Sequence, residues 1–247
     1  MTSERYPSLK VSVLMPVFNE RNTVEHAVAR VRQVAMNMEI ICVDDFSNDG
    51  TRDLLTSLRD SGQIDGLILH TRNQGKGSAV RTALGAATGD VVVIQDADLE
   101  YDPEDILKLL GPVEDGRADA VFGSRFRGDV SRVLYYWHSV GNWGLTTLSN
   151  MLTNINVSDM ETCYKLVRTD LMKSLPLESD RFGFEPELTA RLAQAKARIY
   201  EVPISYSGRT YAEGKKIKWT DGVAALWHIV KFNLFSRKAP VYRRQSS

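Results

Sequence analysis

In the first half of the chain, short apolar runs typical of strands alternate with segments in which apolar residues have helical spacing. Short runs of Val, Ile and Leu, typical of strands buried on both faces, occupy residues 10–16, 39–43, 66–70, 91–94 and 118–123. Between these runs, apolar residues recur every three or four positions over residues 22–34, 51–58, 77–87 and 103–110, which is the spacing of an amphipathic helix. This alternation predicts an α/β fold with a mainly parallel central sheet.

The second half is less regular. Helices are predicted over residues 135–152, 170–175, 185–195 and 221–235, and one strand over residues 199–206. No linker divides the two halves. We therefore expect a short N-terminal tail, one domain, and a C-terminal amphipathic helix with a basic tail, over residues 1–9, 10–217 and 218–247.

Two residues mark predicted helix ends. Pro103 stands in the first turn of its helix, where a missing N–H costs nothing. Gly89 follows the helix over 77–87 and is predicted to cap its carboxyl end.

Composition narrows the functional classes. Lys and Arg number 31 and so do Asp and Glu, so no net charge favours nucleic-acid binding. Cys42 and Cys163 are isolated, which indicates neither a disulfide framework nor a zinc site. The N-terminus lacks a signal-peptide pattern, and no apolar run reaches transmembrane length. A cytoplasmic protein is expected.

The candidate chemistry begins where the fourth predicted strand ends. Asp96, Asp98 and Glu100 follow Ile94 at every second position, and alternate residues of an extended chain point to one side. Open α/β sheets bind ligands at the carboxyl ends of their strands. Three carboxylates there predict a site for Mg²⁺ or Mn²⁺. The alternative is a solvated turn after the strand.

Polar residues also follow the first three predicted strands, so the same crevice can collect them. The first two carry Pro16-Val17-Phe18-Asn19-Glu20 and Val43-Asp44-Asp45-Phe46-Ser47-Asn48-Asp49-Gly50-Thr51, and the third carries Asn73-Gln74-Gly75-Lys76-Gly77. Aspartates at such ends can accept from a nucleobase or a ribose hydroxyl. Glycines allow close backbone approach and Lys76 offers a charge for a phosphate. The alternative is helix capping by Asn19, Ser47 and Asp49.

In this order, the four elements resemble the family-two inverting glycosyltransferases. The resemblance implies a GT-A fold, a nucleotide-diphosphate sugar donor and a divalent metal, Mg²⁺ or Mn²⁺. It implies that Asp96 and Asp98 hold the metal and the diphosphate, with Glu100 as a further ligand. The residues expected to bind the donor are Pro16, Phe18, Asn19, Glu20, Val43, Asp44, Asp45, Lys76, Gly77, Asp96 and Ala97.

The second half resembles one branch of that family, the polyprenyl-phosphate sugar synthases. The elements that carry the resemblance are Gly123-Ser124-Arg125, Asp159-Met160-Glu161-Thr162-Cys163-Tyr164-Lys165, Phe182-Gly183-Phe184-Glu185 and the run from Arg209 to Ile217. Cys163 replaces the usual Gly, and Lys215-Lys216 replaces the usual Ser-Lys. The implied reaction transfers a hexose, from GDP-mannose or UDP-glucose, to a polyprenyl phosphate with inversion.

A phosphate acceptor needs cations to bind it and no strong base. The candidates for this role are Arg125, Arg132, Arg209, Lys215 and Lys216. A polysaccharide or protein hydroxyl as acceptor would instead need a carboxylate base, for which Asp159 and Glu185 are available, and Asp159 can also position the acceptor. A non-catalytic nucleotide-sugar-binding module is a third hypothesis, which the intact Asp96-Ala97-Asp98 argues against.

A lipid acceptor also requires contact with a bilayer. Residues 222–235 are apolar with Trp and Phe, and residues 231–247 contain five basic residues and no acidic one. This pattern is typical of a helix lying on an anionic membrane surface, and we expect a peripheral location at the inner face. The alternative is a core-packing helix or a dimer contact.

Overall fold

The fold is built on one mixed sheet. A computed structural model describes residues 9–127, 132, 135–181, 183–210, 219–236 and 242. Within these residues lie seven strands: β1 (Val11–Val17), β2 (Met38–Asp44), β3 (Gly66–Leu69), β4 (Val91–Ile94), β5 (Ala120–Ser124), β6 (Lys165–Arg168) and β7 (Ile199–Pro203). Their order across the sheet is β3-β2-β1-β4-β6-β5-β7. All neighbours are parallel except β6, which runs antiparallel to both β4 and β5.

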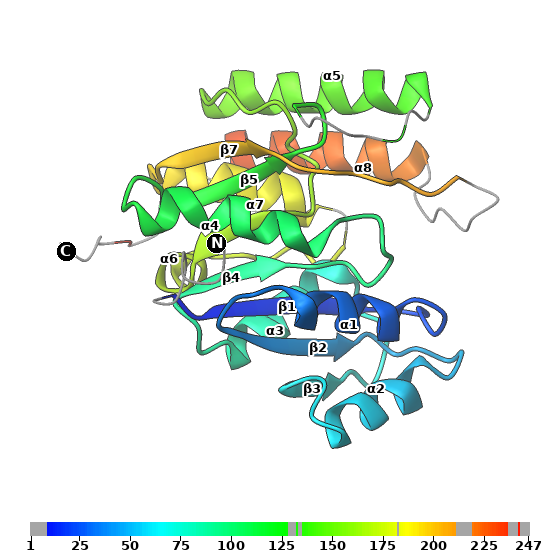
Figure 1. The fold of residues 1–247 in the computed structure, drawn as a ribbon. Helices are drawn as coiled ribbons and strands as arrows, with labels where there is room; N and C mark the ends of the chain where they lie inside the picture. Colours follow the sequence, from blue (N-terminus) through cyan, green and yellow to red (C-terminus); the bar gives the residue numbers. More distant parts are fainter. Residues whose placement is uncertain are drawn as a thin grey trace.

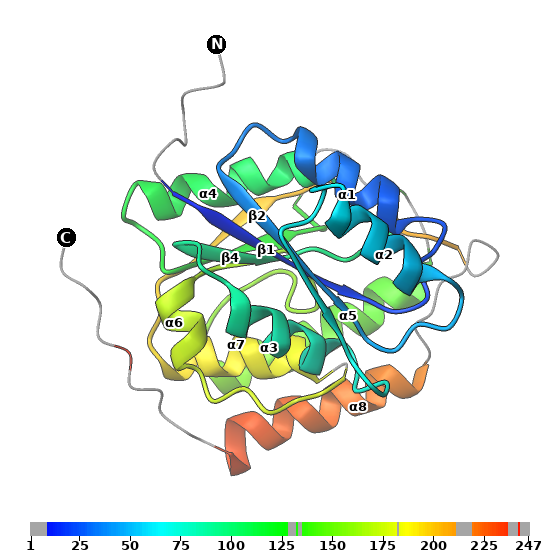
Figure 2. The ribbon, with the colours of Figure 1, turned by 90° about the horizontal axis from the view of Figure 1, so that it is seen from below.

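Helices lie on both faces of the sheet (Figure 2). One side carries α1 (Val24–Gln33), α2 (Thr51–Asp60) and α4 (Ile106–Glu114), and the other carries α3 (Lys76–Ala86), α6 (Thr169–Ser174) and α7 (Phe184–Gln194). Figure 1 shows α5 (Tyr136–Thr153) as the outermost element at one end, with α8 (Trp219–Val230) next to it. A π-helical turn, Lys231–Phe235, continues α8.

The expected α/β fold is confirmed, and each predicted strand and helix has a counterpart within a few residues of its predicted bounds. Strand β6 was missed, because its four residues, Lys165–Arg168, begin and end with a cation. The cap predicted at Gly89 is wrong. Helix α3 ends at Ala86, and Gly89 is needed elsewhere, since a Cβ there would lie 2.6 Å from the carbonyl oxygen of Lys10. Pro103 does open its helix, in a short 3-10 turn (Pro103–Asp105) before α4.

Two C-terminal expectations stay open. The boundary predicted at residues 217 and 218 lies outside the described residues, as do Lys215 and Lys216. Helix α8 buries Ala225 and Ile229 but exposes Val223, Leu226 and Trp227, so it has apolar groups on both faces. None of the helices in the described part of the chain combines the length and the apolar character needed to span a bilayer.

Candidate active site

The candidate site lies where the strands β1, β2, β4 and β5 end. Because β6 runs the opposite way, the loop that leads into it arrives at this same edge. That loop carries Asp159, which is thereby placed against Arg125, the residue after β5. One antiparallel strand therefore brings the second half of the chain to the carboxylates of the first half.

The two aspartates at the carboxyl end of β2, Asp44 within the strand and Asp45 after it, are buried and bound within the protein. Asp44 accepts from Nε and Nη2 of Arg52, at 2.9 and 2.8 Å, and Arg52 also donates to the carbonyl of His70. Asp45 contacts His70 Nδ1 at 2.8 Å and accepts from the backbone N–H of Gly75 at 2.6 Å. These contacts tie the loops after β2 and β3 together, and both carboxylates have partners within the protein.

The loop after β1 supplies more accessible groups. Phe18 is exposed and Pro16 is half-buried, whereas Val43 lies in the core. Asn19 has a φ of 52°, and its side-chain oxygen accepts from the N–H of Asn48 at 3.0 Å. An exposed aromatic ring beside a fixed backbone offers a stacking surface for a base.

None of the three residues in the capping alternative is a helix N-cap, since that position is Thr23 for α1 and Gly50 for α2. Asp49 accepts from the N–H of Thr51, the first residue of α2, at 3.0 Å. Ser47 instead accepts from the N–H of Asn19 at 2.9 Å, which joins the loops after β1 and β2.

Lys76 is held between two carboxylates. Its Nζ lies 3.0 Å from Asp96 and 2.9 Å from Glu185, which comes from α7. Gly77, the next residue, has no room for a side chain, because a Cβ there would run into the carbonyl oxygen of Ser179. Ala97 is buried between the two aspartates of its motif. The predicted phosphate loop thus packs directly on the segment that precedes α7.

Arg209 occupies the centre of the acidic group after β4. Its Nη2 lies 3.1 Å from Asp98, its Nε lies 3.1 Å from Glu100, and its Nη1 lies 3.8 Å from Glu20. Glu100 also accepts from the hydroxyl of Tyr206 at 2.8 Å. Burial and the charges of Asp96 and Glu100 raise the pKa of Asp98 to about 7, although Arg209 opposes this shift.

Arg125 and Asp159 form a further ion pair of the site. Asp159 is fully buried and accepts from Nε and Nη2 of Arg125 at 2.7 and 2.8 Å. Burial alone would raise the pKa of Asp159, but the charge and hydrogen bonds of Arg125 outweigh it and the pKa lies below its usual value. The guanidinium also lies 5.1 Å from the ring centre of Tyr206 and touches Asn142 of α5. Asp159 therefore orients Arg125.

The contacts of Asp96, Asp98 and Glu100 bear on whether these carboxylates suit a divalent cation. Asp96 and Asp98 already hold the cationic groups of Lys76 and Arg209. In the described part of the chain, no three Asp, Glu, His or Cys side chains gather into a metal site. Magnesium is commonly held by only one or two carboxylates together with substrate phosphates. Asp96 and Asp98 fit that arrangement, and a role for Glu100 remains a prediction.

Several site residues were not found by sequence reasoning. Arg52, His70 and Tyr206 belong to no recognised motif, and their roles depend on loops meeting in space. Lys165 was part of a motif, but its place was not foreseen: it is buried, and its Nζ donates to the carbonyls of Met160 and Thr162. Arg132, a predicted acceptor-binding residue, donates to the carbonyl of Gly208 and so supports the segment before Arg209.

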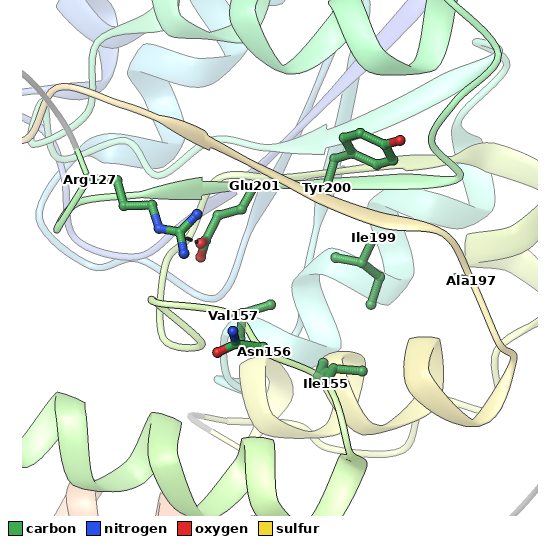
Figure 3. A pocket seen from close by; sticks show the side chains of 8 residues that line it. All are labelled: Arg127, Ile155, Asn156, Val157, Ala197, Ile199, Tyr200 and Glu201. Carbon is green, nitrogen blue, oxygen red and sulfur yellow. Dashed lines mark ion pairs between the residues drawn. The ribbon is translucent and has the colours of Figure 1, made fainter.

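A cavity of about 480 Å³ lies at the β7 edge of the sheet and is lined by none of the predicted site residues. Figure 3 shows Arg127 and Glu201 pointing toward one another there, at 3.2 Å. Glu201 also accepts from the N–H groups of Ser158 and Asp159, at 2.7 and 3.2 Å. The cavity wall thus supports the loop that carries Asp159.

Comparison with known proteins finds relatives that are named as polyprenyl-phosphate sugar transferases. An undecaprenyl-phosphate mannosyltransferase of Micrococcus luteus is 28% identical over 93% of this chain and 96% of its own length. A dolichol-phosphate mannosyltransferase of Pyrococcus furiosus is 29% identical over 84% of this chain, and a dodecaprenyl-phosphate galacturonate synthase of Rhizobium johnstonii is 27% identical over 87%. The matches span only 59% and 64% of those two longer proteins.

Solved structures give the same picture of the fold. The glucosyl-3-phosphoglycerate synthase of Mycobacterium tuberculosis, solved with Mn²⁺ and uridine diphosphate, superposes with a TM-score of 0.70 at 19% identity, over 92% of this chain and 80% of that one. The same enzyme has been solved with Mg²⁺. This likeness confirms the expected GT-A fold. The profile of the family described as glycosyl transferase family 2 matches residues 12–175, more than half of the sequence, and the chain belongs to that family of glycosyltransferases.

Proposed function

We propose that the protein transfers a hexose from GDP-mannose or UDP-glucose to a polyprenyl phosphate, with inversion at the anomeric carbon. The observation that supports this most is the position of Arg125. Its guanidinium is paired with Asp159 and lies against the ring of Tyr206. The hydroxyl of Tyr206 donates in turn to Glu100, one of the carboxylates after β4. A cation for the acceptor thus lies next to the group that would hold the departing diphosphate.

On the donor side, Phe18 stacks on the base, and Lys76 and Arg209 bring positive charge to the diphosphate. Asp96 and Asp98 would hold Mg²⁺ or Mn²⁺, which stabilises the negative charge that develops on the departing diphosphate. Lys76 and Arg209 each rest on a carboxylate of this motif. A bound diphosphate therefore meets cationic side chains that already lie beside the motif.

On the acceptor side, the chain needs no general base. A phosphate monoester has a second pKa of about 6, so much of it is a dianion at neutral pH and is itself the nucleophile. A hydroxyl acceptor would need a free carboxylate nearby. Of the two carboxylates considered for that role, Asp159 is paired with Arg125 and Glu185 with Lys76, so neither is free to act as a base.

The product identifies the acceptor. The protein is incubated with Mn²⁺, undecaprenyl phosphate and labelled GDP-mannose or UDP-glucose. We expect label to enter the organic phase and to be released by mild acid, and to fall to background with EDTA or without the lipid. Label that appears only in water-soluble polysaccharide or protein contradicts the proposal.

We further propose that the protein rests on a membrane surface through α5 and α8, at the inner face. Both helices expose large apolar side chains: Tyr136, Trp137, Trp143 and Met151 on α5, and Val223, Leu226, Trp227, Leu234 and Phe235 on α8 and its π turn. Exposed patches of this kind are typical of interaction surfaces, and Trp and Tyr favour the bilayer interface. Helix α5 also contacts Arg125 through Asn142, so a lipid lying along it would meet the acceptor cation.

Vesicle binding tests this surface. Replacing Trp137 and Trp143 with Ser is expected to lower co-sedimentation with phosphatidylcholine–phosphatidylglycerol vesicles at least about tenfold, because each Trp contributes a large apolar area. Leu69→Ser is the control, since Leu69 is exposed on β3, at the opposite end of the molecule from α5 (Figure 1). If the double variant and the wild type bind vesicles equally, α5 does not contact the membrane.

A further inference from the structure

The segment between Asp159 and Lys165 carries a carboxylate that the ion pairs of the site do not use. The Oε1 atom of Glu161 is buried, and no hydrogen-bond partner for it exists in the described part of the chain. A buried oxygen without a partner is costly and rare in native proteins, where a functional role or a bound water or ion commonly explains it. Glu161 is therefore a candidate for substrate contact.

The neighbouring carboxylates have protein cations as partners. Asp159 holds Arg125, while Asp96 and Glu185 share Lys76. The nearby Lys165 ammonium donates to two backbone carbonyls. Burial, and then the charge of Glu185, raise the pKa of Glu161 to about 7, against the opposing effects of Lys165 and Arg125. Glu161 thus adds hydrogen-bond acceptor capacity, at Oε1, that no described residue uses.

The position of Glu161 follows from its neighbours. Along the chain it lies between Asp159, which pairs with Arg125 after β5, and Cys163, whose Sγ lies 3.6 Å from a carbonyl oxygen at the end of β4. On the diphosphate side, Lys76 pairs with both Asp96 and Glu185. Arg125 lies on the acceptor side. The segment that carries Glu161 thus joins the acceptor side of the site to the end of β4, and the sugar is transferred between these two sides.

We propose that Glu161 lines the donor sugar site, accepts hydrogen bonds from sugar hydroxyls, and makes the site select a neutral hexose over a hexuronate. This inference rests on the proposed function. A hydroxyl that donates to a carboxylate forms a strong, charge-assisted bond and satisfies the buried oxygen. A uronate would place a second negative charge beside Glu161 and Glu185, and like charges brought together in a desolvated site are strongly unfavourable. The family alone does not decide this point, because relatives of similar identity are named for mannose and for galacturonate transfer.

Donor binding tests the assignment without any acceptor. Affinities are measured by titration calorimetry with Mn²⁺ for two matched pairs, UDP-glucose with UDP-glucuronate and GDP-mannose with GDP-mannuronate, and for UDP and GDP alone. The wild type is expected to bind one neutral donor at least about tenfold more tightly than its uronate partner. Glu161→Gln is expected to reduce that ratio to about threefold or less and to leave the affinity for the bare nucleotide unchanged. Glu25→Gln, on the exposed face of α1, is the control and keeps the wild-type ratio.

The assignment is overturned if the wild type binds neither neutral donor, or binds a neutral donor no more tightly than its uronate partner. It is also overturned if Glu161→Gln keeps the wild-type ratio of neutral to uronate affinity. A parallel loss of affinity for the bare nucleotide in Glu161→Gln would indicate a structural role and overturn it as well. Glu161→Asp controls for a folding artefact, because it keeps the negative charge. It is expected to keep at least the square root of the wild-type ratio of neutral to uronate affinity. Failure of the proposed function looks different, since the sugar preference would persist while no label reached the lipid phase.

Discussion

Asp98→Asn is expected to lower glycosyl transfer by about a thousandfold or more and to leave the fold intact. The side chain is not part of the hydrophobic core, and its contacts are Arg209 and the N–H of Glu100. An amide keeps the size of the carboxylate but loses the charge that would hold both a divalent cation and Arg209. Turnover is measured with the labelled-donor assay, and the fold by circular dichroism and thermal melting.

A second readout separates loss of metal binding from other causes. Binding of Mn²⁺, followed by electron paramagnetic resonance in the presence of UDP or GDP, is expected to weaken at least about tenfold in Asp98→Asn. Asp53→Asn provides the control, because Asp53 is an exposed carboxylate in the first turn of α2. Asp98 is not a metal ligand if the variant keeps more than a tenth of wild-type turnover with unchanged Mn²⁺ binding.

The strand ends of the first half could be predicted from the sequence because they depend on local signals. The run from Val91 to Ile94 is wholly buried, and the aspartates begin two residues later, at the edge where parallel strands place polar groups. The same reasoning found the loops after β1, β2 and β3. The hydrogen bonds between these loops could not be predicted in this way, since the partner of Asp45 is His70, which lies 25 residues away.

The second half was harder to predict because its geometry depends on one short strand. Strand β6 has only Leu166 and Val167 as apolar residues between two cations, too few to show a period. Without an antiparallel strand there, nothing in the sequence indicates that Asp159 and Arg125 meet. Both were named as site residues, but their mutual contact is a property of topology. For the same reason the burial of Lys165 could not be foreseen.

That contact makes Arg125→Ala the second variant with a large expected effect. Its loss removes the proposed acceptor cation, so we expect turnover with undecaprenyl phosphate to fall by about a hundredfold to a thousandfold. It also leaves the fully buried Asp159 without its partner, and an uncompensated buried charge costs about 3–5 kcal/mol of folding free energy. Urea denaturation measures the second effect, and donor affinity is expected to stay near the wild-type value.

The double variant Arg125→Ala/Asp159→Asn separates the two roles of the pair. Removing the charge of Asp159 is expected to restore most of the lost stability, because an amide is cheaper to bury than a lone carboxylate. It restores no turnover, since the acceptor phosphate still lacks its cation. Arg117→Ala is the control, because its pair with Asp115 is exposed on both sides and is expected to contribute little to stability. If the double variant regained stability and turnover together, Arg125 would act only by neutralising Asp159, and the acceptor phosphate would have to bind elsewhere.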